Sequence, residues 1–138
     1  MGNAKRGDIG GEADGMNKKV LLIEDEPNII EAISFILMRD GWEVKTHSNG
    51  HDAMEAVRSR EADLIILDVM LPGRSGFDIL KDIRADADIA DTPVLMLTAR
   101  GQDKDREMAE RVGANRFMTK PFSNADVLDA VKSMVAIS

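Results

Sequence analysis

Five polar side chains stand at the ends of four short apolar runs in this chain. They are Glu24, Asp25, Asp68, Thr98 and Lys120. Carboxylates bind divalent cations, while a hydroxyl and an ammonium group can stabilise the oxygens of a transferring phosphoryl group. If the runs are parallel strands, their carboxyl ends lie along one edge of a sheet, where open α/β sheets form their ligand sites. The sequence therefore predicts one shared crevice at that edge.

The loop after the first apolar run excludes a dinucleotide site, which would need a glycine-rich turn for close approach of backbone amides to a pyrophosphate. Here the loop reads Glu24-Asp25-Glu26-Pro27. Two like charges about 4 Å apart repel by roughly 4 kcal/mol at an effective dielectric constant of about 20. An acidic loop beside Asp68 therefore requires a cation. Oxygen ligands of this kind suit Mg²⁺ or Mn²⁺, so the pattern indicates a divalent metal and a phosphoryl group.

The elements that must position these residues alternate between strand and helix five times. Three continuous apolar runs are typical of strands covered on both faces: Val20–Ile23, Leu64–Leu67 and Val94–Leu97. The polar and apolar alternation around Val44 and the short, mixed segment Arg116–Thr119 indicate edge strands. Helical periodicity is found in five segments: Pro27–Arg39, Asp52–Ser59, Gly76–Ala85, Lys104–Val112 and Asn124–Val135.

This alternation predicts an α/β fold, a doubly wound sheet of five parallel strands with helices on both faces. The order 2-1-3-4-5 of the flavodoxin-like folds puts the two predicted edge strands at the edges. The topological switch then lies between the first and third strands. Glu24, Asp25 and Asp68 should meet there.

Four motifs carry a resemblance to a known family. They are Glu24-Asp25, Leu67-Asp68-Val69-Met70-Leu71-Pro72-Gly73, Thr98-Ala99 and Lys120-Pro121-Phe122. In order, spacing and strand-end placement they resemble the receiver domain of two-component response regulators, with a chemotaxis-regulator-like fold. The resemblance covers residues from about 18 to 135. It also implies a cis peptide bond before Pro121.

The resemblance implies that Asp68 is the phosphoacceptor, which forms an acyl phosphate in a magnesium-dependent reaction. Asp25 and Asp68 would supply carboxylate oxygens to the metal, and Met70 would supply its backbone carbonyl. Glu24 would act mainly through water. The chain would then be a signalling protein that catalyses only its own phosphorylation and dephosphorylation, and not an enzyme acting on other substrates.

The resemblance also implies a conformational switch. Thr98 would donate its hydroxyl to one phosphoryl oxygen and Lys120 would pair with another. Phe117 occupies the position of an aromatic side chain that turns inward when the threonine moves. We expect Phe117 to favour the inward rotamer even without phosphate, because burying a phenylalanine stabilises by about 1.5 to 3 kcal/mol.

Two further positions vary in the family and affect how long the phosphoryl group lasts. They are Met70, two residues after the phosphoacceptor, and Arg100, two residues after Thr98. An apolar Met70 cannot orient an attacking water, and Arg100 could lie across the phosphoryl oxygens. We therefore expect slow self-dephosphorylation.

The partners that the resemblance implies are a histidine kinase or a histidine phosphotransfer protein, recognised around the first helix and the loop after Lys120. A downstream protein, or a second copy in a homodimer, would bind the fourth helix, fifth strand and fifth helix. Two other functions remain open. One is a phosphate-independent interaction module, and the other is an aspartyl-phosphate phosphohydrolase. The latter usually needs a second acid where this chain has Met70.

Composition and net charge limit the domain organisation, the partners and the compartment that we expect for this chain. The 138 residues carry a net charge of −7 and no cysteine. A single domain at residues 18–138 follows a glycine-rich segment at residues 1–17, which we expect to be a flexible tail. The negative charge disfavours direct binding to nucleic acid. No apolar stretch approaches the roughly 18 residues of a membrane span, and the absence of cysteine fits a reducing cytoplasm.

Overall fold

The computed structural model describes residues 18–99 and 103–135. The predicted tail at residues 1–17 and Arg100 lie outside this part of the chain. The strands are β1 (Lys19–Ile23), β2 (Glu43–His47), β3 (Leu64–Asp68), β4 (Val94–Thr98) and β5 (Arg116–Thr119). The helices are α1 (Pro27–Arg39), α2 (Ala53–Arg60), α3 (Gly76–Ala85), α4 (Asp103–Val112) and α5 (Asn124–Val135).

All five strands are parallel and follow the order β2-β1-β3-β4-β5. The sequence-based prediction of the fold is therefore confirmed. Ile23 of β1 lies beside Leu67 of β3, and Asp68 lies beside Leu97 of β4. This register brings the last residues of the central strands to the same edge of the sheet.

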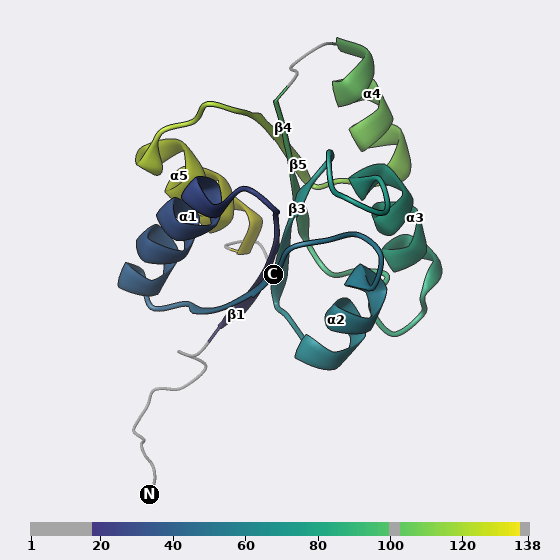
Figure 1. Ribbon diagram of the computed structural model, residues 1–138, viewed down its shortest axis with the longest axis horizontal. Coiled ribbons are helices and arrows are strands. Elements are labelled where there is room, and N and C mark those ends of the chain that lie inside the picture. Colours follow the sequence, from purple (N-terminus) through teal and green to yellow (C-terminus); the bar gives the residue numbers. More distant parts are fainter. Residues whose placement is uncertain (1–17, 100–102, 136–138) are drawn as a thin grey trace, which may run out of the picture.

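Helices cover both faces of the sheet, as Figure 1 shows. Helices α1 and α5 lie on one face, and α2, α3 and α4 lie on the other. Each layer has its own apolar core. Alternate residues of one strand point to opposite layers, so Leu22 packs in the α1 and α5 layer while Leu21 packs in the other. Burial on both faces explains the continuous apolar runs of the central strands.

Helix ends follow local sequence signals. The Ser123 hydroxyl accepts the Asp126 N–H at 3.0 Å, and the Asp126 carboxylate accepts the Ser123 N–H at 3.1 Å. This reciprocal pair starts α5. Gly41 and Gly113, just after α1 and α4, have φ angles of 96° and 110°. Glycine ends these helices because it adopts the left-handed conformation without a steric cost.

The loop after β3 is held tightly against the strand by Gly76, the first residue of α3. Its N–H donates to the Val69 carbonyl at 2.9 Å. A Cβ atom at this position would lie 2.2 Å from the carbonyl oxygen of Asp68. Only glycine permits this approach, which fixes the backbone that carries Asp68.

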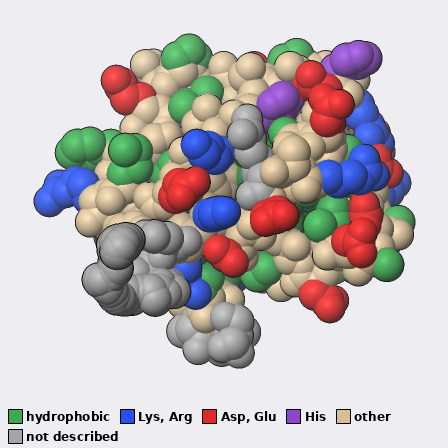
Figure 2. Space-filling model, turned by 90° about the horizontal axis from the view of Figure 1, so that it is seen from below, with side chains coloured by type: hydrophobic (Ala, Val, Ile, Leu, Met, Phe, Trp, Pro, Cys, Tyr) green, Lys and Arg blue, Asp and Glu red, His purple; other side chains and the backbone are tan. Residues whose placement is uncertain are grey.

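On the face drawn in Figure 2, acidic side chains lie among basic ones. His47 of β2 pairs with Asp52, whose Oδ1 lies 2.6 Å from the imidazole Nε2. Among the described helices, none is both long and apolar enough to cross a bilayer.

Candidate functional site

The carboxyl ends of the strands bring the predicted polar residues to one edge of the sheet. Asp68 and Thr98 are the last residues of β3 and β4, and both are almost completely buried. Glu24 follows β1, and its N–H donates to the carbonyl of His47 at 2.9 Å. Lys120 follows β5 and is joined to Pro121 by a cis peptide bond, as the sequence resemblance implied.

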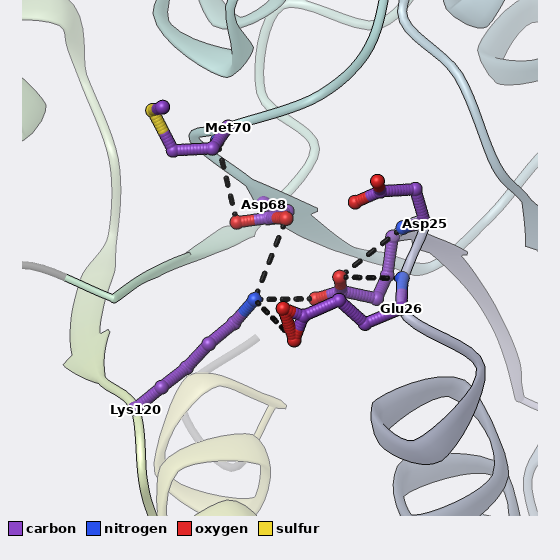
Figure 3. A network of polar contacts seen from close by, with 6 residues as sticks. Asp25, Glu26, Asp68, Met70 and Lys120 are labelled. Atoms are coloured by element: carbon purple, nitrogen blue, oxygen red, sulfur yellow. Dashed lines mark hydrogen bonds and ion pairs between the residues drawn. The ribbon is translucent and has the colours of Figure 1, made fainter.

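Lys120 is the centre of the charged network drawn in Figure 3. Its Nζ lies 3.0 Å from Glu24 Oε1, 3.4 Å from Asp68 Oδ2 and 3.7 Å from Glu26 Oε1. The lysine side chain is only 11% exposed. A buried ammonium group therefore compensates carboxylates that come from three separate positions in the sequence.

Glu24 is fully buried and held by the backbone of its own loop. Its Oε2 accepts the N–H groups of Asp25 and Glu26, each at 3.1 Å. With Lys120 on its other oxygen, Glu24 fixes the shape of the acidic loop. This arrangement turns the Asp25 carboxylate toward Asp68 (Figure 3).

Three carboxylates lie close enough to share a cation. Glu24, Asp25 and Asp68 each offer one oxygen, and these oxygens lie within 4.8 Å of one another. Asp25 is exposed whereas Glu24 and Asp68 are buried, so the group is open to solvent on the Asp25 side. Hard oxygen donors with room for water are what Mg²⁺ requires. The donor set therefore fits a divalent cation.

The electrostatics of the site favour a cation. Burial, together with the neighbouring Glu24, raises the pKa of Asp68 to about 7, although Lys120 and the Met70 N–H act to lower it. Burial alone would lower the pKa of Lys120, but Glu24, Asp68 and Glu26 together raise it. Lys120 is therefore charged at neutral pH, while Asp68 is poised between its two forms.

Met70 contributes its backbone to the site and turns its side chain away. Its N–H donates to Asp68 Oδ1 at 3.3 Å. The thioether side chain points to the exterior, and the residue is 59% exposed (Figure 3). Beside it runs an open groove of about 660 Å³ that extends from Asp25 along the loop to Ser75. This groove leads from solvent to the acidic group.

Phe117 lies on the α3 and α4 side of the sheet. Its ring is partly buried against the apolar core of that layer, and the Arg106 guanidinium carbon lies 5.1 Å from the ring centre. The cation stacks on the aromatic face. Phe117 of β5 is the neighbour of Met96 in β4. Along the strand it therefore lies two residues before the position that pairs with Thr98.

Sequence reasoning located most of the site. Glu24, Asp25, Asp68 and Lys120 meet as predicted, and Thr98 ends the strand next to Asp68. The contact between Glu26 and Lys120 was missed. A glutamate beside two other acids gives no signal of which carboxylate reaches the lysine, because that depends on side-chain direction in the folded state.

Comparison with known proteins identifies the family. Residues 20–132 match the model of the response regulator receiver domain. The chain belongs to this family. It is 38% identical over 120 residues to the alkaline phosphatase synthesis transcriptional regulatory protein PhoP of Bacillus subtilis. The match covers 87% of this chain and 49% of PhoP, so the chain spans about half the length of that relative.

Solved receiver domains have the same fold. The chemotaxis response regulator CheY4 of Vibrio cholerae is 30% identical, with a TM-score of 0.81 over 86% of this chain and 99% of that one. The receiver domain of the sensor histidine kinase PA1611 of Pseudomonas aeruginosa, which has a magnesium ion coordinated in the active site cleft, is 28% identical. Its TM-score is 0.80 over 87% of this chain and 98% of that one.

Membership in the family settles the class of activity. Receiver domains are phosphorylated on an aspartate, bind Mg²⁺ at an acidic pocket, and interact with histidine kinases and downstream effectors. This receiver domain has an acidic pocket of that kind at Glu24, Asp25 and Asp68. The predicted family is confirmed, and with it the predicted class of function, a receiver domain that is phosphorylated on an aspartate.

Proposed function

We propose that Asp68 is the aspartate that accepts the phosphoryl group. The observation that supports this most strongly is the position of its carboxylate, which is 3.4 Å from Lys120 and shares an acidic group with Asp25. No other carboxylate in the described part of the chain ends a central strand beside a buried lysine. Treatment with a small phosphodonor and Mg²⁺ should label the protein, and Asp68→Asn should abolish the label.

In the proposed reaction, a carboxylate oxygen of Asp68 attacks the phosphorus of a phosphohistidine. The P–N bond breaks, its electron pair returns to the imidazole nitrogen, and an acyl phosphate forms on Asp68. Lys120 lies where it can neutralise an oxygen of the transferring group. The N–H of Met70 holds Asp68 Oδ1, so that Oδ2 lies on the lysine side.

We propose Mg²⁺ as the resident ion, held by Asp25, Asp68 and the Met70 backbone carbonyl, with Glu24 in a supporting role. Glu24 already accepts two backbone N–H groups and forms an ion pair with Lys120, which is why we assign it to shaping the loop and reaching the metal through water. The ion would offset the carboxylate charge and lower the pKa of Asp68. Mn²⁺ should substitute, because it prefers the same oxygen ligands.

The switch that we propose uses Thr98 and Phe117. Thr98 is buried one strand away from Asp68, and its hydroxyl would turn to a phosphoryl oxygen. Phe117 is already packed on the apolar core, which supports an inward preference without phosphate. Its stacking on Arg106 links the ring to α4, the helix that we propose reports phosphorylation to a partner or to a second copy of the chain, together with β5 and α5.

We place the contact with the phosphodonor protein on α1. Phe35 and Met38 are apolar yet 60% and 61% exposed on this helix. Phe35 also lines an open groove of about 360 Å³ that Leu128 of α5 lines from the other helix. Exposed apolar side chains of this size mark interaction surfaces. Substituting Phe35 by aspartate should slow phosphoryl transfer from a histidine kinase but not from a small donor.

We further propose that the acyl phosphate decays slowly. The Met70 side chain points away from Asp68 and offers no hydrogen bond to an attacking water (Figure 3). A Met70→Asn variant should shorten the lifetime of the phosphoryl group. Arg100→Ala tests the second proposed modulator in the same assay. If neither variant changes the decay rate, these two positions do not control it.

A further inference from the structure

Glu26 is part of the charged network but has no assigned role in phosphoryl transfer. It precedes α1 at the N-cap position, yet its side chain accepts no hydrogen bond from the helix. Its carboxylate instead turns to Lys120, with Oε1 at 3.7 Å from Nζ, while the side chain is 53% exposed (Figure 3). Glu26 therefore places a partly exposed negative charge beside the ammonium group.

The charge balance of the pocket depends on this residue. The buried or metal-facing carboxylates are those of Glu24, Asp25 and Asp68, and one ammonium group with one divalent cation would balance them. Glu26 adds a fourth carboxylate to the pocket, and it is the third that lies within 4 Å of the lysine ammonium. It leaves the metal-loaded pocket with one negative charge in excess.

We propose that Glu26 is a specificity-determining residue that disfavours small, highly charged phosphodonors. Its carboxylate partly neutralises the Lys120 ammonium, and it repels a dianion before the donor reaches Asp68. A donor protein can place a basic side chain opposite Glu26, and this pairing removes the repulsion. The inferred partner is therefore a phosphohistidine protein with a lysine or arginine beside the histidine, which would pair with Glu26. The inference rests on the proposed role of Asp68.

The test compares Glu26→Gln and Glu26→Lys with the unsubstituted protein at saturating Mg²⁺. Acetyl phosphate, a dianion at neutral pH, should label Glu26→Gln about two- to fivefold faster, as expected for one partly exposed charge, and Glu26→Lys faster still. Phosphoramidate, which is less negatively charged, should show a smaller gain. Both gains should shrink as salt is added, because salt screens exposed charges.

A second measurement distinguishes the effect of removing one negative charge from a loss of structure in the site. Calorimetric titration should show weaker binding of Mg²⁺ to Glu26→Gln although phosphorylation becomes faster, since removing a negative charge lowers cation affinity. A loss of site structure would instead lower both. The matched control is Glu31→Gln, which removes an exposed carboxylate from the second turn of α1 and should change neither quantity.

Equal or slower labelling of Glu26→Gln overturns the inference, as does an equal gain in Glu31→Gln or a gain independent of salt. These outcomes leave the role of Asp68 intact, because the unsubstituted protein is still labelled. A failure of the proposed function has a different signature. The unsubstituted protein is then not labelled, or Asp68→Asn is labelled equally well, and both proposals fall.

Discussion

Lys120 reaches Asp68 across an intervening strand. The two residues stand at the ends of β5 and β3, with β4 between them, yet Lys120 Nζ lies 3.4 Å from Asp68 Oδ2. Adjacent strands are about 4.8 Å apart, so the lysine side chain, the 3.4 Å contact and the aspartate side chain together span roughly two strand spacings. The ammonium group is thereby placed over the centre of the sheet edge. It can respond to a change of charge on Asp68.

Removing this ammonium should destabilise the metal-free protein. Lys120→Met keeps much of the side-chain length but leaves Glu24 and Asp68 without their cation. We expect the free energy of unfolding to fall by about 2 to 4 kcal/mol in the presence of a chelator. Mg²⁺ should restore part of this loss and should bind more tightly than to the unsubstituted protein, because a competing positive charge is gone. Urea unfolding with and without Mg²⁺ measures both effects.

The control for this variant is Lys81→Met, which removes an exposed lysine of α3 with the same change in net charge. Its free energy of unfolding should change by no more than about 0.5 kcal/mol. If Lys120→Met is as stable as Lys81→Met without Mg²⁺, the lysine does not compensate the buried carboxylates.

The exposed member of the acidic group should control cation affinity. Asp25→Asn removes a charged oxygen ligand without changing side-chain size, so Mg²⁺ should bind about tenfold more weakly or worse. Calorimetric titration gives the affinity directly. Asp129→Asn, on the exposed face of α5, carries the same substitution away from the site and should bind Mg²⁺ normally. Equal affinities for the two variants would place the metal elsewhere.

The raised pKa of Asp68 makes stability depend on pH when no metal is bound. The pKa is about 7 in the folded protein against an ordinary value of 3.8. The folded state therefore binds the proton more tightly, and the contribution to stability is fully present below about pH 4 and lost as the pH rises through 7. Asp68→Asn cannot ionise, so it should escape this loss.

We therefore expect Asp68→Asn to exceed the unsubstituted protein in stability by more at pH 8 than at pH 5, by about 1 to 3 kcal/mol. Unfolding curves at the two pH values, recorded with a chelator, give this difference. Added Mg²⁺ should reduce it by stabilising the ionised carboxylate. A stability difference that is the same at both pH values would mean that Asp68 ionises normally.

Gly76 should be needed for the position of Asp68. An alanine Cβ would overlap the Asp68 carbonyl oxygen, so Gly76→Ala must displace the backbone, at a cost of about 1 to 3 kcal/mol. The displacement should also weaken Mg²⁺ binding. Ser75→Ala provides a contrast, because it removes only the hydroxyl that caps the Phe77 N–H at 3.1 Å. That variant should lose about 1 kcal/mol and keep its affinity for Mg²⁺.

The parts of the structure that sequence could predict are those set by local pattern. The continuous apolar runs predicted the central strands, and the residues that end them predicted where Glu24, Asp25 and Asp68 meet. The contact between Glu26 and Lys120 could not be predicted from such a pattern. Glutamate at a helix start usually faces the helix amides, and only the folded position of Lys120 decides otherwise.

Other details depended on close contact in three dimensions. The approach of Gly76 to the Asp68 carbonyl has no sequence pattern beyond a glycine at a helix start. The stacking of Arg106 on Phe117 joins residues of α4 and β5 whose side chains carry no signal for each other. Such contacts arise from packing between elements, which local periodicity does not encode.

The central claim is that Asp68 carries the phosphoryl group. The most direct measurement is to incubate the protein with acetyl phosphate and Mg²⁺, trap the acyl phosphate by reduction with borohydride, and map the modified residue by mass spectrometry of peptides. We expect that Asp68 alone is converted, and that the signal disappears with a chelator or in Asp68→Asn. Conversion at another residue, or an unchanged signal in Asp68→Asn, would contradict it.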